Sequence, residues 1–242
     1  MRRACACGRG WWRLALGKAY AYVLAAVLGL GAGWLARLWA ARLVGSEVRA
    51  ARVLGPACGA LAWALIVCVR GPGLESCFQC LVCIPLLACS LTDLAAYVIP
   101  NACVACAASV RAAYLLAVGL CDSAQLPALL ARSLVGAAGT LVPMLALTLV
   151  MDRVLGTDSM GGGDLKLLAV CGLWVGLRQM LFLLPVACVG GILSSVMLTR
   201  AQDGPSSGAL SPFPFGPSIA LALLVTFLVG PHVEAWLAAW VF

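Results

Sequence analysis

Charged residues are scarce in this chain of 242 residues, of which only 10% are Asp, Glu, Lys or Arg. Hydrophobic residues make up 64% of the chain, and the mean hydropathy is +1.05. Both values lie well outside the range of soluble globular domains. The composition therefore indicates an integral membrane protein.

Histidine is nearly absent, since His232, which follows Pro231 near the C-terminus, is the only one. This excludes zinc proteolysis through an HExxH motif, and a Ser-His or Cys-His catalytic pair would depend on that one side chain. No stripe of basic and aromatic residues suggests nucleic acid either. We expect no nucleic-acid partner.

The thirteen cysteines do not point to a metal centre. Cys77 and Cys80 in "CFQC" have the spacing of metal ligands, but one CxxC is half of a zinc site and no second is visible. Most of the others lie inside predicted spans, as small apolar residues often do: Cys68, Cys83, Cys89, Cys103, Cys106, Cys171 and Cys188. We predict packing roles for them, with no metal and no cofactor.

Apolar stretches long enough to cross ~30 Å of hydrocarbon as helices recur along the whole chain. The predicted spans are 19–36, 57–70, 77–99, 102–120, 128–150, 165–182, 183–199 and 217–230. The short alternating segments of a transmembrane β-barrel are missing. The sequence predicts an all-α, polytopic membrane helix bundle of about eight transmembrane helices, with a basic N-terminal tail (1–18) and one membrane domain (19–242).

Two connections are basic. Arg37, Arg42, Arg49 and Arg52 follow the first span, and Arg153 and Lys166 flank a glycine-rich segment. By the positive-inside rule both connections are cytoplasmic. The four predicted spans between them agree, because an even number returns the chain to the same face.

Two of the nine acidic residues stand outside the predicted loops. Asp93 lies about 16 residues into a helix that Pro100 ends, roughly 9 Å short of its end. A carboxylate there costs a few kcal/mol unless it is protonated, paired or facing water, so Asp93 is a candidate functional residue. The alternative is an acid that hydrogen-bonds to Ser90, Thr92 or Tyr97 and fixes packing.

Asp164 follows Gly161, Gly162 and Gly163 and opens the next helix. One role for it is that of a simple helix cap, which stabilises a helix by ~0.5–2 kcal/mol. A cap needs no glycines before it, however, and glycines allow another chain to approach closely, as a substrate-binding loop requires.

Two spans lie between Asp93 and Asp164, so both emerge on the same face. Carboxylates at close range resist joint ionisation, so that one holds a proton while the other activates water. The sequence therefore predicts a catalytic pair.

The segments "LTDLAAYVIPN" (residues 91–101) and "MGGGDLKLLA" (residues 160–169) resemble the paired signature of the type IV prepilin peptidases, membrane aspartyl proteases of the GxGD class. In that family one aspartate precedes an Ile-Pro-Asn turn by six residues, as Asp93 does. The second closes the GxGD motif, as Asp164 does, and a Lys-Leu pair follows, like Lys166-Leu167. "PFGPSIALA" (residues 214–222) resembles a further family segment at the start of a late helix.

The resemblance covers residues 20 to 230 and implies roles for residues at the site. Asp93 and Asp164 would be catalytic, and Lys166 would join the glycines of the substrate loop. We expect structural turns at Pro100 and Asn101 and at Pro214, Gly216 and Pro217, with Asn101 as the cap of the next helix.

The resemblance also implies a function. Family members cut a short basic leader from prepilin or pseudopilin substrates at the cytoplasmic face of the bacterial inner membrane, where membrane lipid is a further partner. Many carry a four-cysteine insert between the first two spans and are associated with N-methylation. The connection from Arg37 to Pro56 is short here and has no cysteine, so we expect a peptidase without methyltransferase activity.

Three other functions remain open from the residues. One is a GxGD protease that cuts inside the bilayer, as presenilin-like proteins do. Another is a proton- or cation-coupled transporter with buried acids. The third is a membrane scaffold without catalysis, in which Asp164 is a helix cap.

Overall fold

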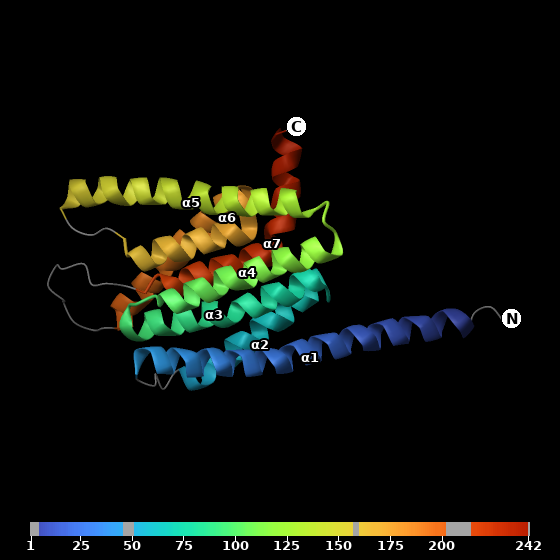
Figure 1. The fold of residues 1–242 in the computed structure, drawn as a ribbon. Helices are drawn as coiled ribbons and strands as arrows, with labels where there is room; N and C mark the ends of the chain where they lie inside the picture. Colours follow the sequence, from blue (N-terminus) through green and yellow to red (C-terminus); the bar gives the residue numbers. More distant parts are fainter. Residues whose placement is uncertain (1–4, 46–50, 157–159, 202–213, 242) are drawn as a thin grey trace.

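The computed structural model describes residues 5–45, 51–156, 160–201 and 214–241, and all regular structure in these ranges is helical (Figure 1). The helices are α1 (Cys5–Val44), α2 (Ala51–Arg70), α3 (Leu74–Ala96), α4 (Asn101–Cys121), α5 (Leu126–Leu155), α6 (Gly162–Ala201) and α7 (Gly216–Val241). Six of them are long and apolar enough to cross a membrane. The predicted all-α, polytopic membrane bundle is confirmed.

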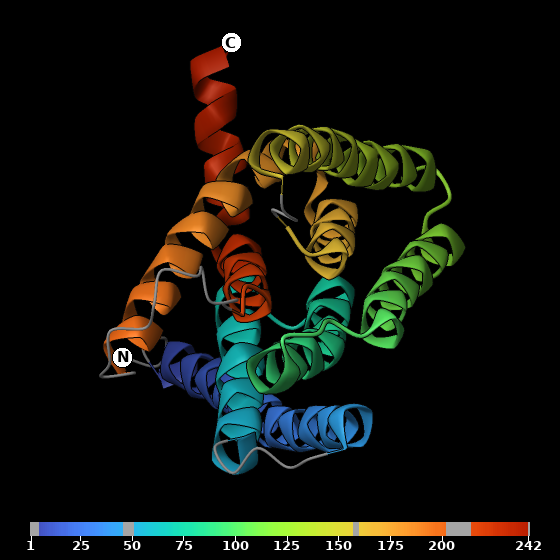
Figure 2. The same ribbon diagram turned by 90° about the vertical axis from the view of Figure 1, so that its left-hand side faces the viewer.

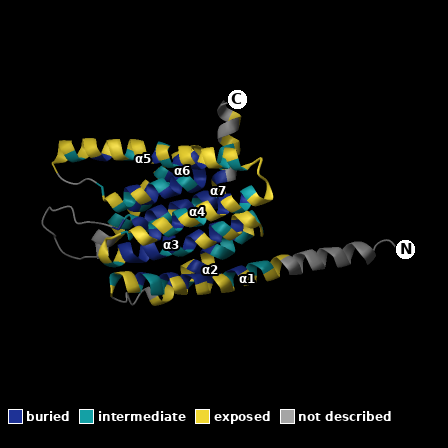
Figure 3. Ribbon diagram, in the orientation of Figure 1, coloured by how far each residue is buried: buried dark blue, intermediate teal, exposed yellow. Residues whose placement is uncertain are grey.

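Helix α3 forms the centre of the bundle. Of its most apolar window 67% is buried, against 17% for that of α5, whose leucines and valines face outward (Figure 3). Such an outward apolar surface suits lipid, because a water-soluble monomer rarely exposes so much. The polar side chains of Gln79, Ser90, Thr92 and Asp93 on α3 are therefore enclosed by protein.

Glycines let neighbouring helices pack backbone to backbone. A Cβ atom built at Gly33 of α1 would overlap the backbone of α2 at Gly55, and one at Gly136 of α5 would overlap α6 at Gly172. Small residues at such crossings are typical of membrane helices, which associate through close van der Waals contact.

The predicted spans 165–182 and 183–199 form one element, α6, which is broken at Gly176. The break lies six residues before the predicted boundary. Gly176 has φ 78° and ψ 166°, a conformation that is essentially restricted to glycine. Arg178 and Gln179 follow the break closely, and this local drop in hydropathy was a usable signal for its position.

The two segments of α6 run in opposite directions, and the helix begins and ends at the same end of the bundle (Figures 1 and 2). The second segment packs on α7, with Gln179 beside Gly230 and Gly190 beside Ser218. The later residue of α6 therefore meets the earlier residue of α7, so the two are antiparallel. With the two segments of α6 taken separately and the short apolar part of α7 included, the described helices fit the predicted count of about eight. The described residues hold six long ones, with α6 counted once, and the apolar part of α7 is short.

One end of the bundle, at the left of Figure 1, collects the segments that the sequence singled out. The end of α1, the start of α2, the α3–α4 turn and the starts of α6 and α7 all lie there. We call it the dyad end, because it holds the predicted catalytic pair, Asp93 and Asp164. Residues 5–18 of the predicted tail are a helical continuation of α1, whereas residues 1–4, and Arg49 in the first basic connection, lie outside the described residues.

Candidate active site

Asp93 lies in the last turn of α3, and its side chain is only 6% exposed. The helix ends because Tyr97 adopts a left-handed conformation (φ 53°) and donates its backbone N–H to the Asp93 carbonyl oxygen at 2.9 Å. Pro100 then disfavours helical backbone before it, and α4 begins at Asn101. Asp93 is thus held one turn before a sharp reversal of the chain.

Asp164 lies in the first turn of α6 and is half-buried. The helix begins at Gly162, so the interpretation of Asp164 as its N-cap is wrong: Asp164 is the third helical residue. Its backbone N–H donates to the Gly161 carbonyl oxygen at 3.0 Å. Its Oδ2 lies 3.2 Å from where a Cβ atom on Gly161 would be, so the carboxylate folds back over the helix start.

The structure brings the two aspartates together, as the two spans between them predict. Asp93 lies at the end of α3 and Asp164 at the start of α6. The start of α6 packs on the α3–α4 turn, where a Cβ atom added to Gly163 would lie 3.0 Å from Cβ of Ile99. A larger residue at position 163 would push Asp164 away from α3.

Gly216, the first residue of α7, contacts Asp93 directly. Its backbone N–H donates to Oδ2 of Asp93 at 2.7 Å. A Cβ atom at position 216 would lie 2.9 Å from the same oxygen, so only glycine fits without movement. The sequence predicted Pro214, Gly216 and Pro217 as a structural turn and missed this contact, although a glycine before a helix-starting proline was a usable signal.

The local sequence of α7 explains why Gly216 supplies this donor. The first N–H groups of a helix have no partner within the helix. Here Pro217 has no N–H, and those of Ser218 and Ile219 both donate to the Phe215 carbonyl oxygen at 3.1 Å. The N–H of Gly216 is satisfied by the Asp93 carboxylate, which it holds in one orientation.

The alternative role for Asp93, as a packing residue bonded to neighbouring polar groups, does not match the structure. The hydroxyl groups of Ser90 and Thr92 donate to carbonyl oxygens one turn earlier in α3. Tyr97 is half exposed and bonds Asp93 only through the backbone. The carboxylate is therefore not committed to α3 itself.

Lys166 and Asn101 join α6 to α4 beside the aspartates. The Lys166 Nζ donates to Oδ1 of Asn101 at 3.0 Å, on the exposed side of the dyad end. The expectation that Asn101 caps the next helix is wrong, because Pro100 occupies the N-cap position and Asn101 is the first helical residue. Its amide instead holds the lysine of the predicted substrate loop.

The Oδ1 atom of Asp164 is buried and has no hydrogen-bond partner among the described residues. A buried acceptor without a partner is rare and calls for a water or a ligand. Two adjacent carboxyl groups, one oriented by a backbone amide and one with an unsatisfied oxygen, can bind and activate a water molecule. Within the described ranges no group of three His, Cys, Asp or Glu residues is placed to hold a metal ion.

Comparison with known proteins agrees with the site. Residues 80–196 match the model of the type IV leader peptidase family. A "Prepilin leader peptidase/N-methyltransferase" of Xanthomonas campestris is 36% identical over 115 residues, which are 47% of this chain and 38% of the relative. Its namesake from Stutzerimonas stutzeri is 41% identical over 101 residues, 40% of this chain and 34% of the relative.

The matched part of the chain thus spans little more than a third of the length of these curated relatives. No solved structure matches. The family match includes both aspartates, the α3–α4 turn and the glycine loop. Residues 80–196 of this multi-pass membrane chain therefore form a region of the type IV leader peptidase family.

Proposed function

We propose that this protein is an aspartic endopeptidase that removes the short basic leader from prepilin-like proteins. The observation that carries the proposal is that Asp93, in the last turn of α3, and Asp164, in the first turn of α6, lie at the same end of the bundle, where Gly163 packs on Ile99. The names of the relatives support the choice of substrate. Both aspartates lie near an end of their helices, whereas a coupled transporter is expected to hold its acids near the midplane.

In the proposed reaction a water molecule bound at Oδ1 of Asp164 attacks the carbonyl carbon of the scissile peptide bond. One carboxyl group of the pair accepts a proton from this water, and the other donates its proton to the carbonyl oxygen. When the C–N bond breaks, the leaving amine takes up a proton from the pair. The N–H of Gly216 keeps Asp93 aimed at the reacting atoms.

The glycine loop is proposed to hold the substrate. Gly161 and Gly162 are exposed beside the pair, and no atom lies within 4 Å of where a Cβ on Gly162 would be. An extended peptide can therefore lie against this backbone. By the charges of Arg37, Arg153 and Lys166 we place this end of the bundle in the cytoplasm of a bacterial cell.

An apolar cavity of about 260 Å³ supports a substrate with a hydrophobic segment. It is lined by α2, α3 and α7, and it includes Leu91 and Leu94 beside Asp93 and Pro217 beside Gly216. A substrate helix in this cavity would deliver the residues that precede it to the aspartates.

We further propose that the protein lacks N-methyltransferase activity. The connection between α1 and α2 comprises residues 45–50, and none of them is a cysteine. It has no room for the four-cysteine insert of many family members. Incubation of the purified protein with a prepilin and labelled S-adenosylmethionine should leave the cleaved product unlabelled, and label on that product would refute this part of the proposal.

The peptidase activity is tested by cleavage of a purified prepilin in detergent. We expect Asp93→Asn and Asp164→Asn each to abolish cleavage, because each removes one carboxyl group of the pair. Asp122→Asn, an exposed acid at the far end of α4, is the matched control and should cleave normally. Unchanged elution and thermal unfolding would show that the variants fold, and activity retained in either would refute the pair.

A further inference from the structure

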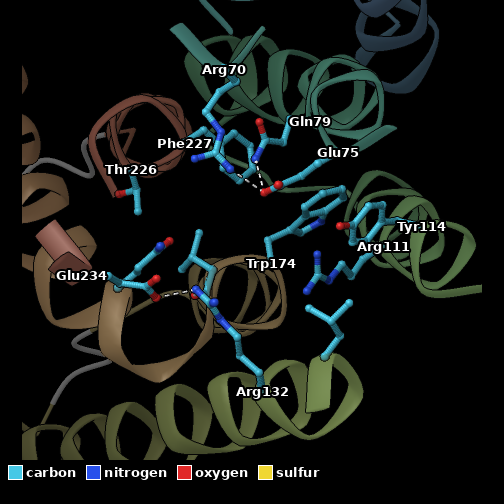
Figure 4. A pocket seen from close by; sticks show the side chains of 13 residues that line it. Arg70, Glu75, Gln79, Arg111, Tyr114, Arg132, Trp174, Thr226, Phe227 and Glu234 are labelled. Atoms are coloured by element: carbon cyan, nitrogen blue, oxygen red, sulfur yellow. Dashed lines mark hydrogen bonds and ion pairs between the residues drawn. The ribbon is translucent and has the colours of Figure 1, made fainter. Parts of the chain in front are cut away.

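Figure 4 shows the lining of a polar cavity of about 310 Å³. Arg70 at the end of α2 and Glu75 at the start of α3 line it, so it lies at the other end of the bundle. Its charged lining consists of Arg70, Arg111 and Arg132 with Glu75 and Glu234. Because Glu75 lies 18 residues before Asp93 on α3, the cavity is about 27 Å from the dyad along that helix. It is separate from the proposed active site.

Two of the three arginines are matched by the two glutamates. Arg70 pairs with Glu75 at 2.7 Å, and Arg132 pairs with Glu234 at 2.5 Å. Arg132 also donates to the Val175 carbonyl oxygen at 2.9 Å, next to the break of α6. These pairs frame the cavity and leave it with one net positive charge.

The remaining charge belongs to Arg111, which lies midway along α4 and is only 5% exposed. Its Nε and Nη2 both donate to Oγ of Ser133, at 3.2 and 2.9 Å. Its guanidinium lies 5.0 Å from the ring centre of Tyr114 and 5.3 Å from that of Trp174 (Figure 4). No carboxylate of the described residues lies within ion-pair distance of it.

These contacts leave Arg111 incompletely compensated. Burial of an ion is costly, and the two aromatic contacts offset only part of that cost. A guanidinium stays protonated and has five N–H donors, of which Ser133 takes two. Ionisable residues inside membrane spans mark functional sites by default. The sequence contained this signal, a lone arginine inside the predicted span 102–120.

We propose that this cavity binds a phosphate-bearing anion and that Arg111 is its principal ligand. The guanidinium fork matches two phosphate oxygens with parallel hydrogen bonds. Gln179 is buried in the same lining, so its amide offers a further donor. The cavity adjoins the end of the bundle, where phospholipid headgroups lie, and the phosphate comes from such a headgroup or from free phosphate.

The lipid arm of the test uses native mass spectrometry on the full chain, purified and delipidated in detergent. Phosphatidylglycerol should bind, and diacylglycerol, which lacks the phosphate, should not. Arg111→Gln should weaken phosphatidylglycerol binding about tenfold, the loss expected for one charge-assisted contact. Arg178→Gln is the control, since Arg178 is exposed just beyond the α6 break and does not line the cavity.

The phosphate arm measures thermal unfolding of the delipidated protein in phosphate and in chloride at equal ionic strength. Stabilisation by phosphate that Arg111→Gln abolishes would identify free phosphate as the source. Binding of phosphatidylglycerol alone would identify the headgroup. If neither anion binds, or if Arg111→Gln binds as well as the wild-type chain, the proposal is overturned.

A second variant covers the case in which Arg111→Gln does not fold. Glu75→Gln removes a negative charge from the lining and leaves Arg111 in place, so it should bind the anion several-fold more tightly. A misfolded or merely loosened protein would not gain affinity. Unchanged or weaker binding by folded Glu75→Gln would contradict the proposal.

Discussion

The backbone N–H of Gly216 and Oδ2 of Asp93 form a 2.7 Å hydrogen bond between residues 123 positions apart in the chain. The bond joins the start of α7 to the end of α3 and orients one of the two carboxyl groups of the site. It also explains why a segment far from both aspartates resembles the family's pattern. The "PFGP" turn is part of the site and not only a connection.

We therefore predict that Gly216→Ala lowers the kcat/KM of leader cleavage at least tenfold. The added Cβ would lie 2.9 Å from Oδ2 of Asp93, so α7 or the carboxylate must move and a charge-assisted bond worth ~1.5–3 kcal/mol is weakened. Cleavage kinetics measure the effect. Gly190→Ala is the control in the neighbouring α6–α7 contact, where the Cβ would meet Ser218 at an ordinary 3.4 Å. Equal activity of both variants would contradict the role of Gly216.

Lys166 and Asn101 should act as a unit. The 3.0 Å hydrogen bond between them is proposed to position the lysine at the substrate loop. Lys166→Met and Asn101→Ala should therefore each lower kcat/KM by about two- to tenfold, because one hydrogen bond contributes ~0.5–1.5 kcal/mol. The double variant should be no worse than either single one. Fully additive losses in this cycle would show that the two residues act independently.

The apolar cavity should govern substrate binding more than chemistry. Leu221 lines it and is 56% exposed, so Leu221→Trp would fill it without disturbing the core. We expect a several-fold higher KM for a full prepilin with kcat nearly unchanged. A peptide that ends before the hydrophobic segment should be cleaved equally by variant and wild type. Leu116→Trp, on the exposed face of α4, is the control for an added surface tryptophan.

The break in α6 should require glycine. Gly176→Ala would place a Cβ 2.8 Å from Cγ of Arg132 in a backbone conformation that costs other residues ~1–3 kcal/mol. We expect that loss in the free energy of unfolding, measured by titration with dodecyl sulfate in mixed micelles. Gly31→Ala, in a part of α1 with no atom within 4 Å of the new Cβ, should be neutral or stabilising. A neutral Gly176→Ala would mean that the chain can turn in another way.

Much of the fold and the identity of the site follow from local features of the chain. Hydropathy determined the membrane spans, because crossing hydrocarbon requires long apolar helices whose backbone groups are satisfied internally. Pro100 determined where one helix ends and the next begins. The even number of spans between Asp93 and Asp164 placed both at one end, and this needs no knowledge of how the helices pack.

Contacts between helices were decided only by the tertiary structure. Gly172 and Gly176 stand one turn apart in an apolar run, yet Gly172 stays helical against Gly136 while Gly176 turns the chain. The polar Arg178 and Gln179 after Gly176 are the local difference, and the tertiary difference is that Gly172 meets Gly136 whereas Gly176 meets Arg132.

The same holds for the polar groups. Sequence identified Asp93 as an acid out of place, but only packing supplied its partner in Gly216, and only packing enclosed Arg111 without a carboxylate. Hydropathy and spacing are properties of single segments. A hydrogen bond or an uncompensated charge depends on the relative position of two or more segments, which exists only once the bundle has formed.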